Sequence, residues 1–326
     1  MSSFSLFARS SFAVVALATL AACAPSSYRV KEPTASALKY EISGTPVAST
    51  RLAFVDERRT DERTFSSGTL PAPLTLASGP VDAMQFLSKN VGTELNSRGL
   101  KLSTIVGSSG QPLVHVRSFR MLNYRSNGFS PFFTSTYLSA DVETPQGPRR
   151  IAAFVRRGKV PVWTFTEVID PTFNQPLSLA VKEFSTKLAS ALYAYKASDA
   201  MVKQLVAKVN GSPTSDTFLD VYALGFTNNP SAIEPLVALT KSGDEYVRLA
   251  AISSLGNLRA TSQFGLLKTM YHDAAVSRQD RDMALKAIAD LGTPESDAFI
   301  RGEVRELGTR SDAESQWTSR ILALYL

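Results

Sequence analysis

Few side chains in this sequence are of the types that carry out catalysis or hold metal ions. Among 326 residues there are one Cys and two His. Zinc sites draw most of their four ligands from these residue types, and neither His115 nor His272 has such partners nearby in the sequence. We expect His115 within a strand and His272 at a helix C-terminus, where a positive charge suits the helix dipole. The sequence therefore predicts no metal site.

The remaining patterns do not favour an enzyme either. Residues 56–63 read DERRTDER, and paired carboxylates can serve acid–base catalysis. Alternating charges without apolar neighbours are more typical of a solvated loop. The GSSG segment at 107–110 lacks the spacing of a nucleophile elbow, and no phosphate-binding loop or dinucleotide fingerprint occurs. We therefore expect no catalytic residues and no cofactor.

An aromatic segment is the first candidate for binding. Phe129, Phe132 and Phe133 occur together with Gly128 and Pro131. If exposed, three such side chains would form a contact patch for a protein or a lipid surface. If buried, they would fill the core beneath a sheet, and this is the interpretation that we favour.

A basic segment is the second candidate for binding. Arg149, Arg150, Arg156 and Arg157 surround a predicted hairpin. Guanidinium groups bind phosphate or carboxylate through paired hydrogen bonds. Positive charge on an edge strand also protects a sheet from pairing with other chains. The sequence alone favours neither interpretation over the other.

The first 23 residues predict an export signal. Residues 10–22 are uncharged and mostly apolar, but at about 13 residues they are too short for a mature spanning helix, which needs about 20. The segment ends in Leu20, Ala21, Ala22 and Cys23, and this string resembles the lipobox of bacterial lipoproteins. The resemblance implies that Cys23 is acylated and becomes the mature N-terminus. Ala24, where an Asp would favour the inner membrane, implies the outer membrane, facing the periplasm or the cell surface.

Charge and composition suggest where the folded parts begin and end. Residues 24–50 are rich in Pro, Ser and Thr and predict a flexible tether that averages roughly 25–30 Å end to end. The turn-forming residues at 210–213 separate a basic part from an acidic one, with net charges of +9 over 24–210 and −4 over 211–326. The basic part could face anionic lipid. Nucleic acid is not expected as a partner of an exported protein.

Hydrophobic periodicity predicts an α+β domain over residues 51–210. Apolar spacings of three and four residues predict helices at 81–95 and 177–195. Alternation predicts strands at 51–57, 100–106, 113–124 with a bulge near Ser118, 136–144 and 151–155, followed by a turn at 157–159 and a strand at 160–165. We expect an antiparallel sheet with two covering helices. The element order and the Asp56-x-Arg58 motif after the first strand resemble outer-membrane lipoproteins of the YajG type.

Residues 211–326 contain a repeated pattern that ends in Leu-Gly. One copy consists of Asp244, Val247, Arg248, Ala251, Leu255 and Gly256. Leu291 and Gly292 repeat its ending 36 residues later, and an earlier Leu-Gly lies 31 residues before it. The pattern resembles the first helix and turn of a HEAT repeat, which implies an all-α solenoid. An apolar residue follows each Gly at the same spacing, at Ile233, Phe264 and Ile300, and residues 312–325 predict a closing helix.

Two functions remain open at this point. HEAT arrays mostly bind proteins, so the resemblance implies a lipid-anchored adaptor of the cell envelope that holds a periplasmic protein. The alternative is a lipid or glycolipid binding or transport protein that uses the basic and aromatic segments.

Overall fold

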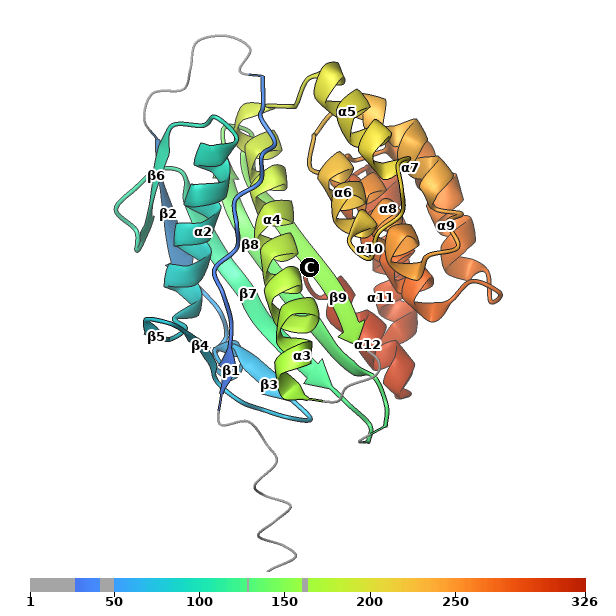
Figure 1. The fold of residues 1–326 in the computed structure, drawn as a ribbon, viewed down its shortest axis with the longest axis horizontal. Coiled ribbons are helices and arrows are strands. Elements are labelled where there is room, and N and C mark those ends of the chain that lie inside the picture. The colour runs from blue at the N-terminus through green and yellow to red at the C-terminus, as the bar shows by residue number, and fades with distance from the viewer. Residues whose placement is uncertain (1–26, 42–49, 128, 160–163) are drawn as a thin grey trace, which may run out of the picture.

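The computed structural model describes residues 27–41, 50–127, 129–159 and 164–326. A sheet covered by helices forms the N-terminal part, and a helical region forms the C-terminal part (Figure 1). The two parts share one continuous set of buried apolar side chains. An α+β part followed by helices is therefore confirmed.

The main sheet is mixed, so the expectation of an antiparallel sheet is wrong. Its strand order is β6-β2-β7-β8-β9, with β3 paired to β7. β2 pairs in parallel with both β6 and β7, whereas β7, β8 and β9 are antiparallel. The chain leaves β2 and returns to β6 through helix α2, and such a crossover produces parallel neighbours. The strands are β2 (Thr50–Asp56), β3 (Ser66–Gly68), β6 (Leu102–Val106), β7 (Leu113–Tyr124), β8 (Phe132–Thr144) and β9 (Gly147–Lys159).

The long hairpin strands extend beyond the predicted ones. The predicted alternation holds in β7 but is wrong for the middle of β8, where residues 134–140 are buried on both faces, Ser139 included. A register shift between Val116 and Ser118 confirms the predicted bulge in β7. β9 continues without a break to Lys159, so the turn predicted at 157–159 is absent from its place. The strand predicted at 160–165 falls largely on residues outside the described part, and Phe165 begins helix α3 (Phe165–Ile169). Arg157 therefore belongs to an edge strand rather than to a turn.

Helices α2 (Ala83–Ser97) and α4 (Gln175–Tyr193) cover one face of the sheet (Figure 1). α2 begins at Asp82, whose carboxylate accepts hydrogen bonds from the backbone N–H groups of Met84 and Gln85 at 2.9 Å. A π-helical turn, Asp170–Asn174, leads into α4. Both predicted helices are confirmed within two residues at each end.

The segment after the predicted lipid anchor is packed, so the expectation of a flexible tether over 24–50 is wrong for residues 27–41. Its apolar side chains are buried: Tyr28, Val30, Leu38 and Tyr40. Strand β1 (Tyr28–Arg29) pairs with β4 (Leu74–Leu76), which also pairs with β5 (Gly79–Pro80). Residues 24–26 and 42–49 lie outside the described part of the chain.

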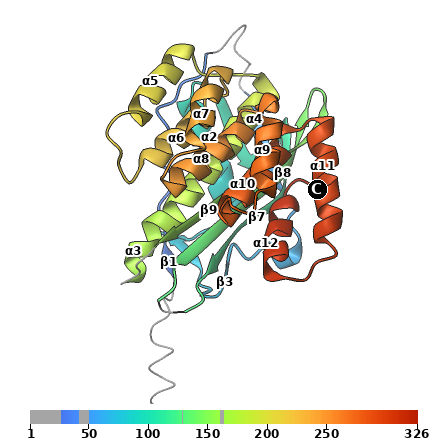
Figure 2. The same ribbon diagram turned by 90° about the vertical axis from the view of Figure 1, so that its right-hand side faces the viewer.

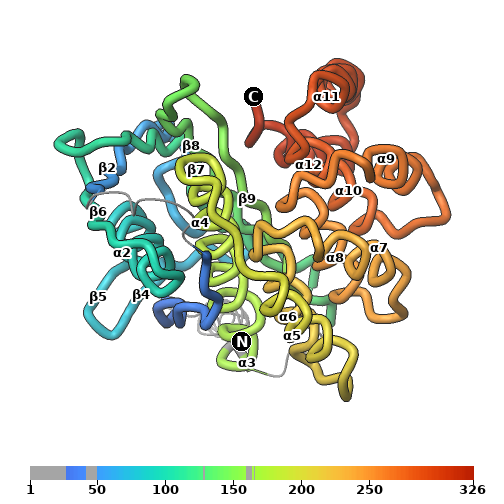
Figure 3. Tube along the Cα trace, turned by 90° about the horizontal axis from the view of Figure 1, so that it is seen from above, coloured from blue at the N-terminus to red at the C-terminus, as the bar shows by residue number. Residues whose placement is uncertain are grey.

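The helical region begins earlier than predicted. Helix α5 (Asp199–Val209) packs on α6 (Thr217–Gly225), so the helices start at residue 199 rather than 211. The first helices α6, α8 (Glu245–Asn257) and α10 (Arg278–Leu291) stack side by side. The second helices α7 (Ile233–Leu239), α9 (Phe264–His272) and α11 (Pro294–Leu307) form an outer row (Figure 3). α12 (Ala313–Leu322) closes the region, as predicted.

Close approach of the stacked helices explains the repeated Leu-Gly pattern. A Cβ added at Gly225 would lie 2.4 Å from the Cβ of Ser254 on α8. A Cβ added at Gly256 would lie 2.7 Å from the Cα of Ala287 on α10. The third glycine, Gly292, instead ends α10 in the left-handed conformation with φ of +61°. Two of the three glycines thus permit helix contact and one terminates a helix.

Replacing Gly256 by Ala should destabilise the protein, although Ala is ordinarily the better helix former. The added methyl overpacks α8 against α10, and we expect the free energy of unfolding to fall by about 1–3 kcal/mol. Gly302 on α11 has no neighbouring atom within 4 Å of an added Cβ, so Gly302→Ala should raise the free energy by about 0.5–1 kcal/mol. Urea unfolding followed by circular dichroism measures both, and equal effects at the two sites would contradict the close helix contact.

The helical region wraps the edge strand β9 (Figures 1 and 2). Outward-facing carbonyls of β9 accept hydrogen bonds from helix side chains: Ala152 O from Lys187 Nζ at 2.6 Å, and Gly158 O from the Tyr246 hydroxyl at 2.9 Å. Edge strands with unpaired carbonyls invite pairing with other chains. Here the protein's own helices cover that edge.

Candidate functional site

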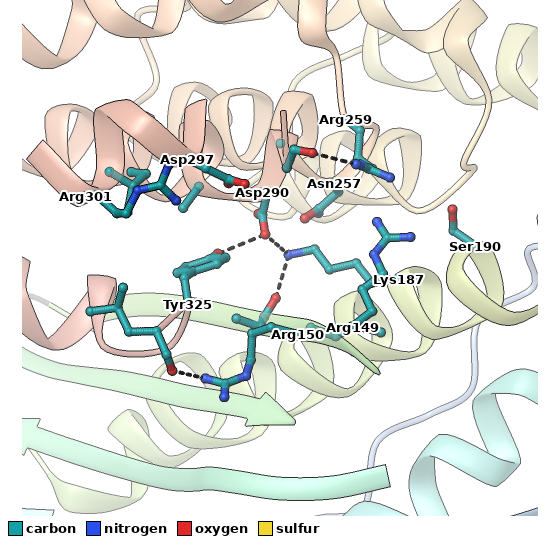
Figure 4. Close-up of a pocket in the computed structure, with 17 residues that line it drawn as sticks. Arg149, Arg150, Lys187, Ser190, Asn257, Arg259, Asp290, Asp297, Arg301 and Tyr325 are labelled. Atoms are coloured by element: carbon teal, nitrogen blue, oxygen red, sulfur yellow. Dashed lines mark hydrogen bonds and ion pairs between the residues drawn. The ribbon is translucent and has the colours of Figure 1, made fainter. Parts of the chain in front are cut away.

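A cleft of about 360 Å³ opens where the edge of β9 meets α4 and the helical region (Figure 4). We call it the junction cleft. This volume lies within the range of about 300–1,000 Å³ typical of small-ligand pockets. The side chains that carry charge or hydrogen-bonding groups in its lining are Arg149, Arg150, Lys187, Ser190, Asn257, Arg259, Asp290, Asp297, Arg301 and Tyr325.

A buried cluster of four charged side chains lies beside the cleft, and two of them, Lys187 and Asp290, line it. Lys286 Nζ on α10 lies 2.6 Å from Glu183 Oε1 on α4 and 2.9 Å from Asp290 Oδ2. Lys187 Nζ lies 2.7 Å from Glu183 Oε1 and 2.6 Å from Asp290 Oδ1. The hydroxyl of Tyr325 donates to Asp290 Oδ1 at 2.9 Å. The two lysines and two carboxylates thus tie the covering helix of the sheet to the helical region.

Burial and opposite charges set the protonation of this cluster. Burial alone would raise the pKa of Asp290, but Lys187 and Lys286 outweigh it and lower that pKa. Burial alone would lower the pKa of Lys286, but Asp290 and Glu183 outweigh it and raise that pKa. Asp290 is therefore held as a carboxylate and is poorly suited to give or take a proton.

Above this cluster the cleft is lined by guanidinium groups from three elements. Arg149 comes from β9, Arg259 follows α8, and Arg301 comes from α11 (Figure 4). Arg259 donates to the backbone carbonyls of Leu291 and Gly292 at 3.1 and 3.2 Å, which fixes its position. Within the described part of the chain, neither the Arg149 nor the Arg301 side chain forms a hydrogen bond or an ion pair.

The Arg149 guanidinium is electrostatically unfavourable in the cleft as it stands. Burial, together with the nearby charge of Arg259, lowers the pKa of Arg149, and Asp290 only partly compensates. Two guanidinium groups that repel one another at a partly buried position are stabilised by an anion between them. The arrangement is chemically suited to hold a phosphate or carboxylate group.

The structure separates the four arginines of the basic segment. Arg149 lies on the same face of β9 as Ile151, the face covered by α4. Arg150 lies on the opposite face. Arg150 Nε lies 2.5 Å from Asp141 Oδ1, and Arg150 also donates to the carbonyl of Leu326. Of the four, Arg149 lines the cleft without a partner from the described chain.

Arg156 and Arg157 have packing roles outside the cleft. The Arg156 guanidinium lies 5.0 Å from the ring centre of Phe133. The buried Arg157 guanidinium lies between Phe218 and Tyr246, 4.0 and 3.8 Å from their ring centres. Cation–π contacts of this kind are strongest where water is excluded. Arg157 therefore packs β9 against α6 and α8 and is not available to a ligand.

The aromatic segment is likewise divided. Phe132 is fully buried beside Tyr28 and Phe173, as the core interpretation predicts. Phe133 is half-buried under Arg156. Phe129 is 99% exposed at the turn between β7 and β8, so the core interpretation is wrong for this residue.

The two histidines and the charged segment at residues 56–63 lie away from the cleft. His115 lies in β7 and its Nδ1 is 2.7 Å from Glu57 Oε1. His272 is the last residue of α9, as predicted. In the charged segment, Arg58 is buried and its Nε donates to Asp56 Oδ1 at 2.8 Å. The Asp56-x-Arg58 motif is thus a local ion pair. Asp61 and Glu62 belong to a short 3-10 turn, Thr60–Glu62.

The residues of the repeated pattern cap or pack the first helices, but the copies do not match position by position: Asp244 is the N-cap of α8, whereas Asp280, 36 residues later, lies in the first turn of α10. Asp244 accepts hydrogen bonds from the backbone N–H groups of Tyr246 and Val247 at the start of α8. Arg248 Nε lies 3.1 Å from Asp280 Oδ2 at the start of α10, and thus links consecutive first helices. The apolar members of the pattern are buried: Val247, Ala251, Leu255 and Leu291.

Sequence reasoning missed most of the cleft. Lys187, Arg259, Asp290 and Arg301 lie on separate elements, up to 114 positions apart in the sequence, and only the fold brings them together. One local signal was present: Glu183 and Lys187, like Lys286 and Asp290, are four residues apart on otherwise apolar helix faces. Charges at such positions indicate a buried ion pair rather than a solvated one.

No protein-family model matches the chain, and no curated protein matches it. Within the described residues, the structure contains no helix that is both long enough and apolar enough to cross a membrane.

Proposed function

We propose that this protein is a lipid-anchored, non-enzymatic binding protein of the bacterial outer membrane. Its ligand carries a phosphate or carboxylate group, which the junction cleft holds through Arg149, Arg259 and Arg301. Acylation of Cys23, as the lipobox-like string implies, would hold the folded part in the envelope. The proposal corresponds to a lipid or glycolipid binding protein of the envelope.

One observation carries this proposal. Arg149 and Arg301 line a cleft of about 360 Å³ without a side-chain hydrogen bond or ion pair from the described chain, beside an Arg259 fixed by backbone carbonyls. Buried guanidinium groups in proteins are usually satisfied by carboxylates or carbonyls. The partly buried Arg149 has no such partner, which favours a ligand anion in the cleft, and the exposed Arg301 stands ready to contact it.

Anion titration of the chain from residue 24 tests the proposal. We expect pyrophosphate or citrate to bind in calorimetry and to raise the unfolding temperature, because a ligand that binds only the folded state stabilises it. Arg149→Gln should weaken binding by about tenfold or more, the effect of one charge-assisted hydrogen bond. Comparing pyrophosphate with citrate separates a phosphate site from a carboxylate site.

Arg305→Gln is the matched control for Arg301→Gln. Both residues are exposed on α11, but Arg305 lies outside the cleft lining. Only the Arg149 and Arg301 variants should lose affinity. Equal losses in all three variants would indicate general charge attraction, and no binding to the wild type would refute the anion site.

Protein binding through HEAT-like repeats is a second candidate function, supported by the outer helices. The inner row of first helices already faces the sheet, so a partner would use α7, α9 and α11 (Figure 3). An aromatic group lies there: the Phe299 ring centre is 6.1 Å from that of Phe264 and 5.9 Å from that of Tyr271. A photocrosslinker at exposed Lys268 should capture a periplasmic protein in cells, and one at Gln204 on α5 should not. Equal capture at both positions would count against this function.

A further inference from the structure

We infer that the turn between β7 and β8 is a second membrane-contact site, which dips Phe129 into the lipid surface that holds the Cys23 acyl chains. We call residues 124–127 and 129–131 the hairpin tip. The inference rests on the lipid anchor of the proposed function and adds an orientation to it. It does not depend on the junction cleft.

The hairpin tip holds most of the exposed large apolar surface of the described chain. Only three large hydrophobic side chains among the described residues are exposed: Tyr124, Phe129 and Leu326. Two of them belong to the tip, and Phe129 is 99% exposed. A single fully exposed Phe is too small for a stable protein interface, which buries about 800 Å² on each partner. It suits insertion into the lipid surface, where each buried side chain contributes separately.

The hairpin tip is built to present Phe129 rather than to bury it. The Ser130 hydroxyl accepts hydrogen bonds from the backbone N–H groups of Ser126 and Asn127, each at 3.0 Å. The Asn127 side chain accepts from the backbone N–H of Phe129 at 2.9 Å. These contacts satisfy three backbone N–H groups of the tip locally, so these groups lose little when water is displaced around the Phe129 ring.

The tip lies at the end of the molecule where the described chain begins. Strand β1 and the turn that follows β7 lie toward the same end of the fold (Figure 1). The ring centre of Tyr28 in β1 is 6.5 Å from that of Phe132, the first residue of β8. Only residues 24–26 separate Cys23 from Ser27, so the lipid attachment point lies within about 14 Å of Ser27 along an extended chain. An acylated Cys23 therefore places this end of the fold at the membrane.

A third aromatic residue reinforces this end. The Trp317 ring on α12 lies 6.3 Å from the ring of Tyr124, and Arg320 lies 4.8 Å from the Trp317 ring centre. Trp and Tyr favour the interface between water and lipid, since their rings are apolar and their edges polar. Two distant parts of the sequence thus supply aromatic side chains at the end where the anchor emerges.

Depth-dependent fluorescence quenching tests the inference. Cys23 is the only Cys in the sequence, so a maleimide lipid attaches the chain 23–326 to vesicles at that position alone. The vesicles contain phosphatidylethanolamine and phosphatidylglycerol with brominated acyl chains. Trp163 and Trp317 are replaced by Phe, and a single Trp is introduced as Phe129→Trp or as Gln146→Trp. Gln146 is exposed at the opposite end of β8, a strand of 13 residues, and is therefore about 40 Å distant.

We expect a blue-shifted and strongly quenched emission for Phe129→Trp, and a water-like emission for Gln146→Trp. For the untethered chain 24–326, Phe129→Ser should lower partitioning onto the same vesicles by about tenfold, the effect of burying one aromatic side chain. Equal quenching at both positions, or none at either, would overturn the inference. Because the tether is made chemically, this result is separate from whether cells acylate Cys23, which mass spectrometry of the exported protein decides.

Discussion

Replacing Lys286 by Met is expected to lower the free energy of unfolding by about 3–5 kcal/mol, the cost of breaking a buried ion pair by removing one partner. The Lys286 side chain is fully buried and touches Glu183, Asp290, Ser253 and Asn257. Its removal leaves Glu183 and Asp290 to share the single charge of Lys187. Urea unfolding measures the loss, and Lys203→Met on the exposed surface of α5 should change stability little.

The double variant Lys286→Met/Glu183→Leu separates charge from packing. If the loss arises from uncompensated buried charge, then removing Glu183 as well should restore part of the stability, since apolar replacement of a whole buried pair is often nearly neutral. Strictly additive losses would instead show that Lys286 acts through packing alone. Lys187 and Asp290 of the same cluster line the junction cleft, so the loss of the Lys286 charge beside them should also weaken anion binding.

Replacing Arg98 by Met is expected to cause a comparable loss, about 3–5 kcal/mol. Arg98 is fully buried and donates from Nε to Glu94 Oε1 at 2.7 Å and from Nη1 to Thr186 Oγ1 at 2.6 Å. It also donates to the Tyr40 hydroxyl, which in turn donates to the carbonyl of Phe226 at 2.9 Å. Hydrogen exchange should show that residues 27–41 lose protection before the rest of the sheet.

Lys101→Met is the control, because Lys101 is exposed close to Arg98 in the sequence.

The stability of the Arg98 site should also depend on pH. Burial alone would raise the pKa of Glu94, but Arg98 and hydrogen bonds from Ser36 outweigh it and lower that pKa. The Glu94 contribution is therefore complete above the ordinary carboxylate pKa and is lost as the pH falls from there through the lowered pKa of Glu94 in the folded protein. If residues 27–41 kept their full hydrogen-exchange protection in Arg98→Met, the proposed role of Arg98 would be contradicted.

Local patterns allowed the helices and long strands to be predicted, because their apolar residues recur with the period of one element. In α2 and β7 burial follows this period, whereas β8 is buried on both faces over residues 134–140. Strand direction was not predictable in the same way: the short apolar runs of β2 and β6 look alike whether they pair in parallel or not. The parallel pairing arises from the α2 crossover between them.

The packed segment 27–41 escaped prediction for a different reason. Its Pro, Ser and Thr content is typical of a linker, and most of its backbone forms no sheet ladder. It is held by isolated side chains, chiefly Tyr28 and Tyr40, whose partners lie far along the chain. The junction cleft was hidden for the same reason, since of its four arginines only Arg149 and Arg150 belonged to a recognised cluster.

The most direct test of the central claim is the native mass spectrum of the full-length protein extracted from envelopes in detergent. The account predicts a chain that begins at an acylated Cys23 and carries an anionic ligand. The ligand should be absent from Arg149→Gln/Arg301→Gln and retained in Arg305→Gln. A ligand-free wild type, or the same ligand on all three proteins, would contradict the assignment of the junction cleft as the binding site.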